Sequence, residues 1–435
     1  MRLLALATAF LGLLPLTVLM PFVGLLLWGW FTLMQPHRLL WGFPEGFEPN
    51  LILAGITLCA WLVSREPKMP PSSPFLVLCV LLTLHLVVVQ LFSERPDYSW
   101  TYFRRFLSVM AFTLLGLTLI NTRVRIHAVA LILCVSIGYY AVLGGLGTLL
   151  TGGRYLLFGP PSTIIADNNH LALAIATTIP ILDYARRQSA RAPVRVVFGA
   201  VIVLGVVAVI GTYSRGALLA LAAMGIVMWL HSRRKLIGLL IGGLALVTIA
   251  TYTTEAWRDR AGTIANYAED PSFVGRRDAW MIAYEVALGR PLIGLGMRVP
   301  YLQQEVDPYL STRRTARAAH SIYFEMLGSA GFVGLALFLG ILASVWRATG
   351  SVLRLARDIP ERAWAADLAR ATRAGLAAFA VGGAGLSMEF WDGFWTIAVL
   401  MTATQSRLEA RQVASAGTAE ILGEPGPVPV RLPRC

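Results

Sequence analysis

The sequence predicts an all-α polytopic membrane protein with about twelve transmembrane helices and one long loop that contains short helices. Of its 435 residues, 56% are hydrophobic and only 14% are charged, and the mean hydropathy is +0.65. The apolar residues form solid runs of about 15 or more, without the period-two alternation of an outer-membrane barrel. At about 20 residues per helix, the apolar residues suffice for about 12 spans, which excludes a water-soluble enzyme with one anchor.

Twelve apolar runs are long enough to cross a bilayer. In chain order they are 3–34, 50–64, 75–93, 106–121, 127–150, 170–185, 196–213, 216–231, 236–253, 321–346, 374–387 and 393–405. The first run is too long for one straight helix and contains Pro15 and Pro21. It therefore predicts either one kinked span or a span plus a re-entrant piece.

The distribution of basic residues predicts the topology. If both termini are cytoplasmic, the short inner loops contain 17 lysines and arginines and the short outer loops contain 6. These inner loops are 64–74, 121–126, 186–195, 231–235 and 347–373. Because cytoplasmic loops collect lysine and arginine, this asymmetry favours both ends inside. The net charge of +13 follows from this topology and requires no nucleic-acid partner.

Four regions follow from this pattern. We expect transmembrane helices 1–9 in residues 1–253, a periplasmic loop with short helices in 254–319, helices 10–12 in 320–405, and a disordered cytoplasmic tail in 406–435. The long loop contains nine arginines and no lysine. Arginine's planar fork suits bidentate binding of phosphate or carboxylate, so the loop is a candidate anion site.

His320 is the first candidate for chemistry. It ends the arginine-rich loop and precedes an apolar span, so its imidazole lies where water, charge and hydrocarbon meet. A neutral imidazole there can accept a proton from a hydroxyl group. The alternative is a structural histidine that caps the helix. His85 stands alone in an apolar run, and for it we expect an interhelical hydrogen bond.

Arg215 is the second candidate. It lies between two apolar runs joined by almost no loop, so its guanidinium belongs at the outer edge of the membrane. A snorkelling arginine at a tight helix junction is the structural alternative. Because basic residues are depleted on this side, we expect an anionic partner for it. Arg276 and Arg277 can supply further positive charge near the same surface.

Three motifs resemble those of bacterial O-antigen ligases. Residues 320–334, HSIYFEMLGSAGFVG, match their pattern of His, then Asn, Ser or Gln (here Ser321), nine residues, Gly, two residues, Gly. Residues 215–219, RGALL, match their motif of Arg, three residues, Leu. The segment 276–296 is similar to one shared by O-antigen ligases and polymerases. Residues 167–172, DNNHLA, resemble a related branch of O-glycosylation ligases, which makes Asn169 a further candidate.

The resemblance to O-antigen ligases implies a fold like that of C-type glycosyltransferases and a specific reaction. Such enzymes transfer a glycan from undecaprenyl diphosphate to a sugar hydroxyl of lipid A-core, at the periplasmic face of the bacterial inner membrane. The resemblance implies that His320 is the general base and that the transfer inverts the anomeric carbon. It also implies catalysis and diphosphate binding without a metal or other cofactor. Arg215 and Arg276 stand in the matched motifs, and Arg277, Arg104 and Arg105 are neighbouring candidates for diphosphate binding.

Several alternatives stay open at this point. A polymerase or a protein O-glycosylation ligase of the same superfamily would differ in its acceptor, and a lipid-linked glycan transporter or flippase would perform no chemistry. A metal-dependent mechanism would use the neighbouring acids Glu305 and Asp307. Glu325, or Glu389 together with Asp392, is a candidate to orient the imidazole of His320.

Overall fold

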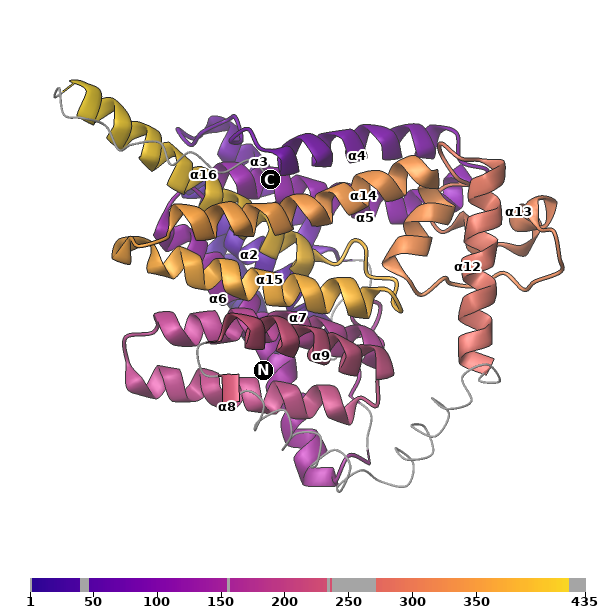
Figure 1. The fold of residues 1–435 in the computed structure, drawn as a ribbon, viewed down its shortest axis with the longest axis horizontal. Coiled ribbons are helices and arrows are strands. Elements are labelled where there is room, and N and C mark those ends of the chain that lie inside the picture. Colours follow the sequence, from indigo (N-terminus) through magenta and orange to yellow (C-terminus); the bar gives the residue numbers. More distant parts are fainter. Residues whose placement is uncertain (1, 40–46, 155–156, 233–234, 237–270, 422–435) are drawn as a thin grey trace.

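The structure is a computed structural model that describes residues 2–39, 47–154, 157–232, 235–236 and 271–421. Within these residues the chain contains helices and no strands (Figure 1), which confirms the all-α class. Nearly all of the expected span 236–253 lies outside the described residues, as does the first part of the expected loop, 254–270.

The helices begin and end close to the apolar runs. They are α1 (Arg2–Leu19), α2 (Pro21–Leu33), α3 (Pro49–Val63), α4 (Pro74–Leu91), α5 (Pro96–Leu119), α6 (Arg123–Thr151), α7 (Asn168–Gln188), α8 (Ala192–Gly211), α9 (Arg215–His231), α12 (Pro271–Gly289), α13 (Gln303–Val306), α14 (Ile322–Leu355), α15 (Ala363–Gly383) and α16 (Asp392–Ile421). Short 3-10 helices are η1 (Pro36–Leu39), η2 (Val299–Tyr301), η3 (Asp307–Tyr309) and η4 (Pro360–Arg362). Helices α2 to α5 each begin with a proline, whose fixed φ suits the first helical position.

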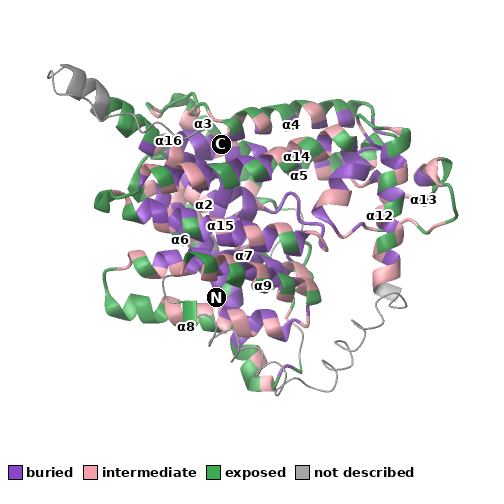
Figure 2. Cartoon of the chain, viewed as in Figure 1, coloured by how far each residue is buried: buried purple, intermediate pink, exposed green. Residues whose placement is uncertain are grey.

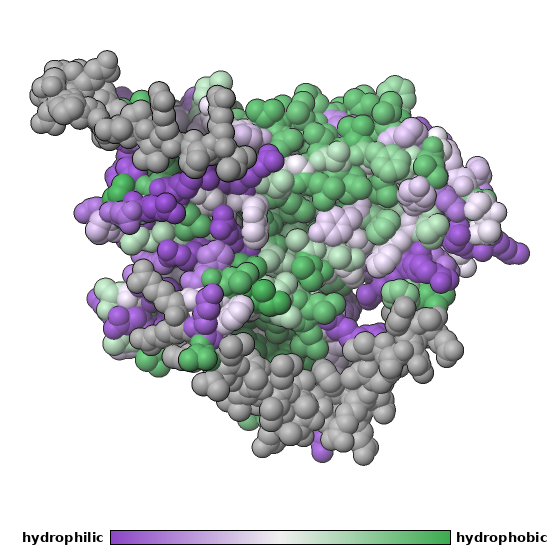
Figure 3. All heavy atoms as spheres, in the orientation of Figure 1, coloured by the Kyte–Doolittle hydropathy of each residue, from purple (hydrophilic) through white to green (hydrophobic). Residues whose placement is uncertain are grey.

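Hydrophobic side chains gather across the middle of the helix bundle, and hydrophilic side chains gather at its two ends (Figure 3). Many apolar residues on this middle band are exposed, whereas the residues between the helices are buried (Figure 2). By length and composition, five of the described helices can cross a membrane, namely α4, α5, α6, α8 and α14. This supports a multi-pass membrane protein, while the count of about twelve spans stays a prediction.

The loops that were assigned to the two sides of the membrane lie at opposite ends of the bundle. Among the expected inner loops, Arg125 pairs with Glu66 at 2.6 Å, and the side-chain amide of Gln188 donates to Asp367 at 3.2 Å. Other contacts join the expected outer loops to one another: the Ser93 hydroxyl donates to the Leu295 carbonyl at 3.2 Å. Each of these contacts joins loops of one set, as the predicted parity requires.

The first run follows one of its two predicted forms, and the tail differs from its prediction. The ring of Phe10 lies 5.2 Å from the ring of Phe31, so α1 folds back along α2 after the break at Met20, which favours a span plus a further piece over one kinked span; from α2 onward the topology stays a prediction. Residues 406–421 continue α16 as a helix where we expected the disordered tail to begin. Their alanines, glutamates and arginines favour helix without being apolar, so a hydropathy pattern misses them.

The arginine-rich segment meets the bundle at one end. Helix α12 lies across the ends of the bundle helices (Figure 1), and the loop after it docks onto α14. The backbone N–H of Phe332 donates to the Pro291 carbonyl at 2.8 Å, and that of Gly296 donates to the Ser329 carbonyl at 3.0 Å. Gly331 breaks α14 here with φ 68°, and a Cβ on it would stand 2.5 Å from the Pro291 oxygen. The first glycine of the histidine motif therefore permits this close backbone contact.

Candidate active site

The backbone at His320 is held in an unusual conformation. His320 has φ 46°, in the left-handed region that few non-glycine residues adopt. The indole N–H of Trp280 donates to the neighbouring Ala319 carbonyl at 2.7 Å, and the Trp280 ring stacks on Phe324, with centroids 5.1 Å apart. Helix α12 and the first turn of α14 thus hold this conformation from both sides.

Ser321, and not His320, caps helix α14. The Ser321 hydroxyl accepts from the backbone N–H groups of Tyr323 and Phe324 at 3.4 and 3.5 Å, as expected for an N-cap serine. The capping alternative for His320 is therefore wrong. The imidazole makes no hydrogen bond with any residue that the structure describes, and it is only partly buried.

Four charged or ionisable groups surround the His320 imidazole. Burial lowers its pKa below the ordinary value of 6.5, and Arg276, His170 and Arg298 lower it further, whereas Glu325 raises it. A lowered pKa keeps the ring neutral at pH 7, the state in which it can accept a proton. The structure therefore brings together two expected site residues, Arg276 and Glu325, with His320.

Arg276 links α12 to the turn between α15 and α16. Its Nη1 lies 3.4 Å from the position that a Cβ on Gly385 would take, so a larger side chain in this turn would press against the guanidinium. Arg215 is the first residue of the neighbouring helix α9, after the N-cap Ser214, and it is exposed. Arg215 begins α9 and Arg276 lies in α12, beside the turn that follows α15.

The other three arginines that were expected to bind diphosphate each contact a carboxylate. Arg104 pairs with Glu48 at 3.2 Å, Arg105 with Asp392 at 3.1 Å, and Arg277 with Asp278 at 3.8 Å. The Arg104 and Arg277 side chains are 59% and 60% exposed. These pairs account for the three arginines without a substrate.

Asn169 belongs to a small polar group at the start of α7. The Asp167 side chain caps this helix by accepting from the Asn169 backbone N–H at 2.8 Å, and it also contacts the His170 ring at 3.3 Å. The Asn168 amide donates to the Thr212 carbonyl at 2.8 Å, which fixes α7 against the turn before α9. Asn169 therefore serves the helix cap, and His170 is the residue of this motif that influences His320.

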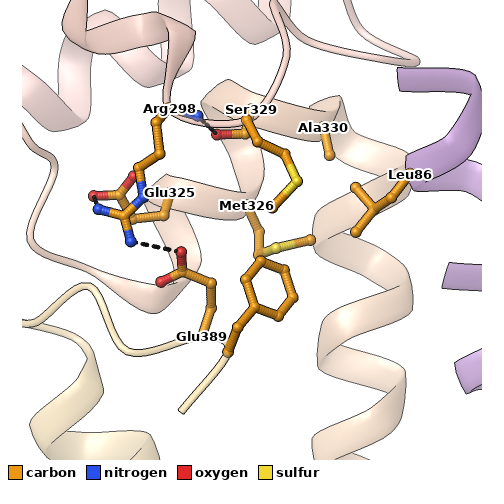
Figure 4. Close-up of a pocket in the computed structure, with 9 residues that line it drawn as sticks. Leu86, Arg298, Glu325, Met326, Ser329, Ala330 and Glu389 are labelled. Atoms are coloured by element: carbon orange, nitrogen blue, oxygen red, sulfur yellow. Dashed lines mark hydrogen bonds and ion pairs between the residues drawn. The ribbon is translucent and has the colours of Figure 1, made fainter. Parts of the chain in front are cut away.

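Glu325 and Glu389, two of the acids considered as partners of His320, belong to a cluster around Arg298 that the sequence does not predict. Arg298 pairs with Glu389 at 2.9 Å and with Glu325 at 3.8 Å (Figure 4). Glu325 also accepts hydrogen bonds from the hydroxyls of Tyr301 and Ser387. Arg298 was one of nine loop arginines in the sequence, and only its φ of 62° and its distant partners set it apart. Neither feature leaves a sequence signal.

The structure also shows the contacts of His85 and of the two acids Glu305 and Asp307. The His85 Nε2 lies 2.9 Å from the Ala330 carbonyl oxygen, so the expected interhelical hydrogen bond is confirmed. Glu305 pairs with Arg95 at 3.3 Å, and Asp307 accepts from the Gln303 amide. Across the described residues, no three histidine, cysteine or acidic side chains are grouped so that they could hold a metal ion.

Comparison with known families agrees with this geometry. Residues 200–339 match the family model of the O-antigen ligases, a range that contains Arg215, Arg276, Arg298 and His320. Residues 1–190 match a family of unknown function (DUF5935), and no curated protein matches the chain. The match over residues 200–339, which carry the histidine and arginine motifs, supports a member of the O-antigen ligase family.

Proposed function

We propose that the protein is an O-antigen ligase that transfers a glycan from undecaprenyl diphosphate to a sugar hydroxyl of lipid A-core. The observation that carries this proposal is the His320 imidazole. It has no hydrogen-bond partner among the described residues, and its lowered pKa keeps it neutral beside Arg276. A free neutral base next to an arginine is the pair that attack by a hydroxyl on a diphosphate-linked sugar requires.

Each group has one role in this reaction. The acceptor hydroxyl attacks the anomeric carbon while His320 takes its proton, and the bond from that carbon to the diphosphate oxygen breaks. Negative charge then grows on the departing diphosphate, where Arg276 and Arg215 stabilise it. Attack opposite the leaving group inverts the anomeric configuration.

We propose that the reaction takes place at the periplasmic face of the inner membrane. The inner and outer loop sets lie at opposite ends of the bundle, and the basic excess belongs to the set that we assign to the cytoplasm. Residues 254–319 then form the periplasmic segment between two groups of transmembrane helices. Both substrates are lipids, so in this proposal they reach an active site at the membrane surface from within the bilayer.

Reconstitution separates this function from its alternatives. Purified protein in proteoliposomes receives the carrier-linked glycan and lipid A-core separately and together. We expect glycosylated lipid A-core only when both are present. Glycan chains that lengthen on the carrier alone would indicate a polymerase, and movement of the carrier without a product would indicate a transporter.

Two histidine variants test the mechanism in the same assay. His320→Gln keeps a polar side chain but cannot accept the proton, so transfer should fall by roughly 100- to 10,000-fold. His231→Gln is the matched control, because His231 lies at the end of α9 opposite to Arg215. Its ring contacts the Val227 carbonyl at 2.7 Å. Transfer by the control should equal that of the wild type, and an active His320→Gln variant would refute the base.

A further inference from the structure

The arginine cluster beside His320 joins four separate parts of the chain. Arg298 lies in the loop before η2, Glu325 in the first turns of α14, Glu389 in the turn between α15 and α16, and Tyr102 in α5. The Arg298 guanidinium lies 5.5 Å from the Tyr102 ring centroid. Glu325 and Glu389 are 4% and 3% exposed, so both carboxylates are almost fully removed from water.

Arg298, Tyr301 and Ser387 each donate a hydrogen bond or ion pair to one of the two carboxylates. Arg298 Nη2 donates to Glu389 Oε1 at 2.9 Å, and Ser387 donates to Glu325 Oε1 at 2.6 Å. The Arg298 backbone N–H donates to the Ser329 hydroxyl at 3.2 Å, which fixes the start of the side chain (Figure 4). Burial raises the pKa of Glu389 although Arg298 opposes the rise, and its Oε2 has no hydrogen-bond partner among the described atoms.

Glu325 stands in the first turns of α14, just after His320, and Glu325 and Arg298 both act electrostatically on the imidazole. Five ionisable groups face the imidazole or its immediate neighbours: Arg276 from α12, His170 from α7, Glu325 from α14, Arg298 from the loop before η2, and Glu389 through Arg298. Of these, Glu325 is the anion with an effect on the ring. An unpaired carboxylate at that position would bind a protonated imidazole and remove the base.

We propose that Arg298 is a positioning residue, which binds Glu325 and Glu389 and thereby keeps both carboxylates away from the imidazole of His320. Arg298 also adds its own positive charge on that side, which disfavours protonation of the ring. The active site thus holds its base neutral by giving the nearest acid another partner. This inference rests on the proposed role of His320, but its first test does not depend on transfer.

The test measures the protonation of His320 directly. Diethyl pyrocarbonate acylates neutral imidazole, so the modification rate of the His320 peptide against pH, followed by mass spectrometry, gives the titration midpoint. Arg298→Met removes the cation and frees Glu325, and both changes should raise the midpoint, by about one pH unit or more. Transfer should then fall up to about tenfold per unit at neutral pH and recover at higher pH.

A second variant shifts the midpoint in the opposite direction. Glu325→Gln keeps an oxygen that accepts from Tyr301 and Ser387 but removes the charge, so the midpoint should fall below that of the wild type. General damage to the fold does not produce opposite shifts in the two variants. Arg290→Met is the control, since Arg290 is also a loop arginine in an ion pair, with Glu94, and it should leave the midpoint unchanged.

The outcomes separate this inference from the proposed function. Opposite shifts of the midpoint confirm the role of Arg298, whether or not transfer changes. An unchanged midpoint in Glu325→Gln overturns the proposed role of Arg298, because the Glu325 carboxylate then has no effect on the imidazole. If Arg298→Met does not accumulate in the membrane, Glu325→Gln alone decides the test. Shifted midpoints with an unaltered transfer profile would instead refute His320 as the base.

Discussion

The ion pairs at the two ends of the bundle differ in how far their partners lie apart in the sequence. At the inner end, Asp183 pairs with Arg186 and Arg187, and Asp367 pairs with Arg370, all within three or four residues. The exception is the pair of Arg125 and Glu66, which are 59 residues apart. These three inner arginines are therefore paired within their own helix.

The outer end uses arginine to join distant segments. Partners there are 91 residues apart for Arg298 and Glu389, 196 for Arg290 and Glu94, and 287 for Arg105 and Asp392. The comparison teaches that arginine has two uses in this chain. Inner arginines add to the basic excess that the charge rule for membrane insertion predicts, and these outer arginines join segments that are distant in the sequence.

The comparison depends first on the two ends facing different compartments. In a variant whose four native cysteines are replaced by alanine, Thr312→Cys places an exposed thiol in the outer segment and Ala190→Cys places one in the loop between α7 and α8. A membrane-impermeant maleimide added to intact spheroplasts should label the first and leave the second unlabelled until the membrane is opened. Labelling of Ala190→Cys alone would reverse the orientation.

Arg276 should carry the largest effect on rate among the outer arginines. Arg276→Ala removes charge from the departing diphosphate, so transfer should fall on the order of 100-fold or more. Arg276→Lys should restore only part, because lysine keeps the charge without the bidentate fork. Arg370→Ala at the inner end is the control in the same transfer assay. Equal rates for Arg276→Ala and the wild type would contradict the diphosphate role.

Ion pairs at the two ends should also differ in their contribution to stability. Glu389→Ala leaves Arg298 buried with the more distant Glu325, at 3.8 Å, as its remaining carboxylate, so the free energy of unfolding should fall by about 3 kcal/mol. Asp367→Ala removes an exposed local pair with Arg370, which should cost less than about 0.5 kcal/mol. Denaturation in mixed micelles measures both, and equal losses would remove the distinction between the ends.

A glycine pair gives the smallest expected effect. Gly331→Ala forces a Cβ against the Pro291 oxygen at a positive φ, so it should reduce the free energy of unfolding by about 1–3 kcal/mol and loosen the loop that carries Arg298. Gly147 in α6 has open space around it, and Gly147→Ala should leave stability nearly unchanged. The same denaturation assay compares them; similar values would show that the kink in α14 does not need glycine.

Hydropathy predicted the helices well where apolar residues and helix limits coincide. The run 50–64 became α3, and the run 127–150 became most of α6. Helix α5 begins at Pro96, ten residues before its run, because Arg104 and Arg105 lower the local hydropathy without interrupting the helix. A hydropathy pattern does not detect helical turns that are made of charged or polar residues. It therefore missed the first turns of α5 and the helical residues 406–421.

The site was predictable only where its residues stand in local motifs. His320 and Arg276 belong to contiguous strings, so their pattern could be read along the chain. Arg298 and Glu389 are recognisable only through a contact that spans 91 residues. The same reason explains why the ion pairs of Arg104 with Glu48 and of Arg105 with Asp392 could not be read from the sequence.

The pH dependence of the wild-type transfer rate tests the central claim most directly. A base must be neutral to accept a proton, and burial together with Arg276 holds the His320 pKa below 6.5. The rate measured in proteoliposomes should therefore stay constant through neutral pH and fall only below pH 6.5, and this acid limb should be absent from the residual rate of His320→Gln. A wild-type rate that already falls above pH 6.5, or that shows no acid limb at all, would contradict a neutral His320 as the general base.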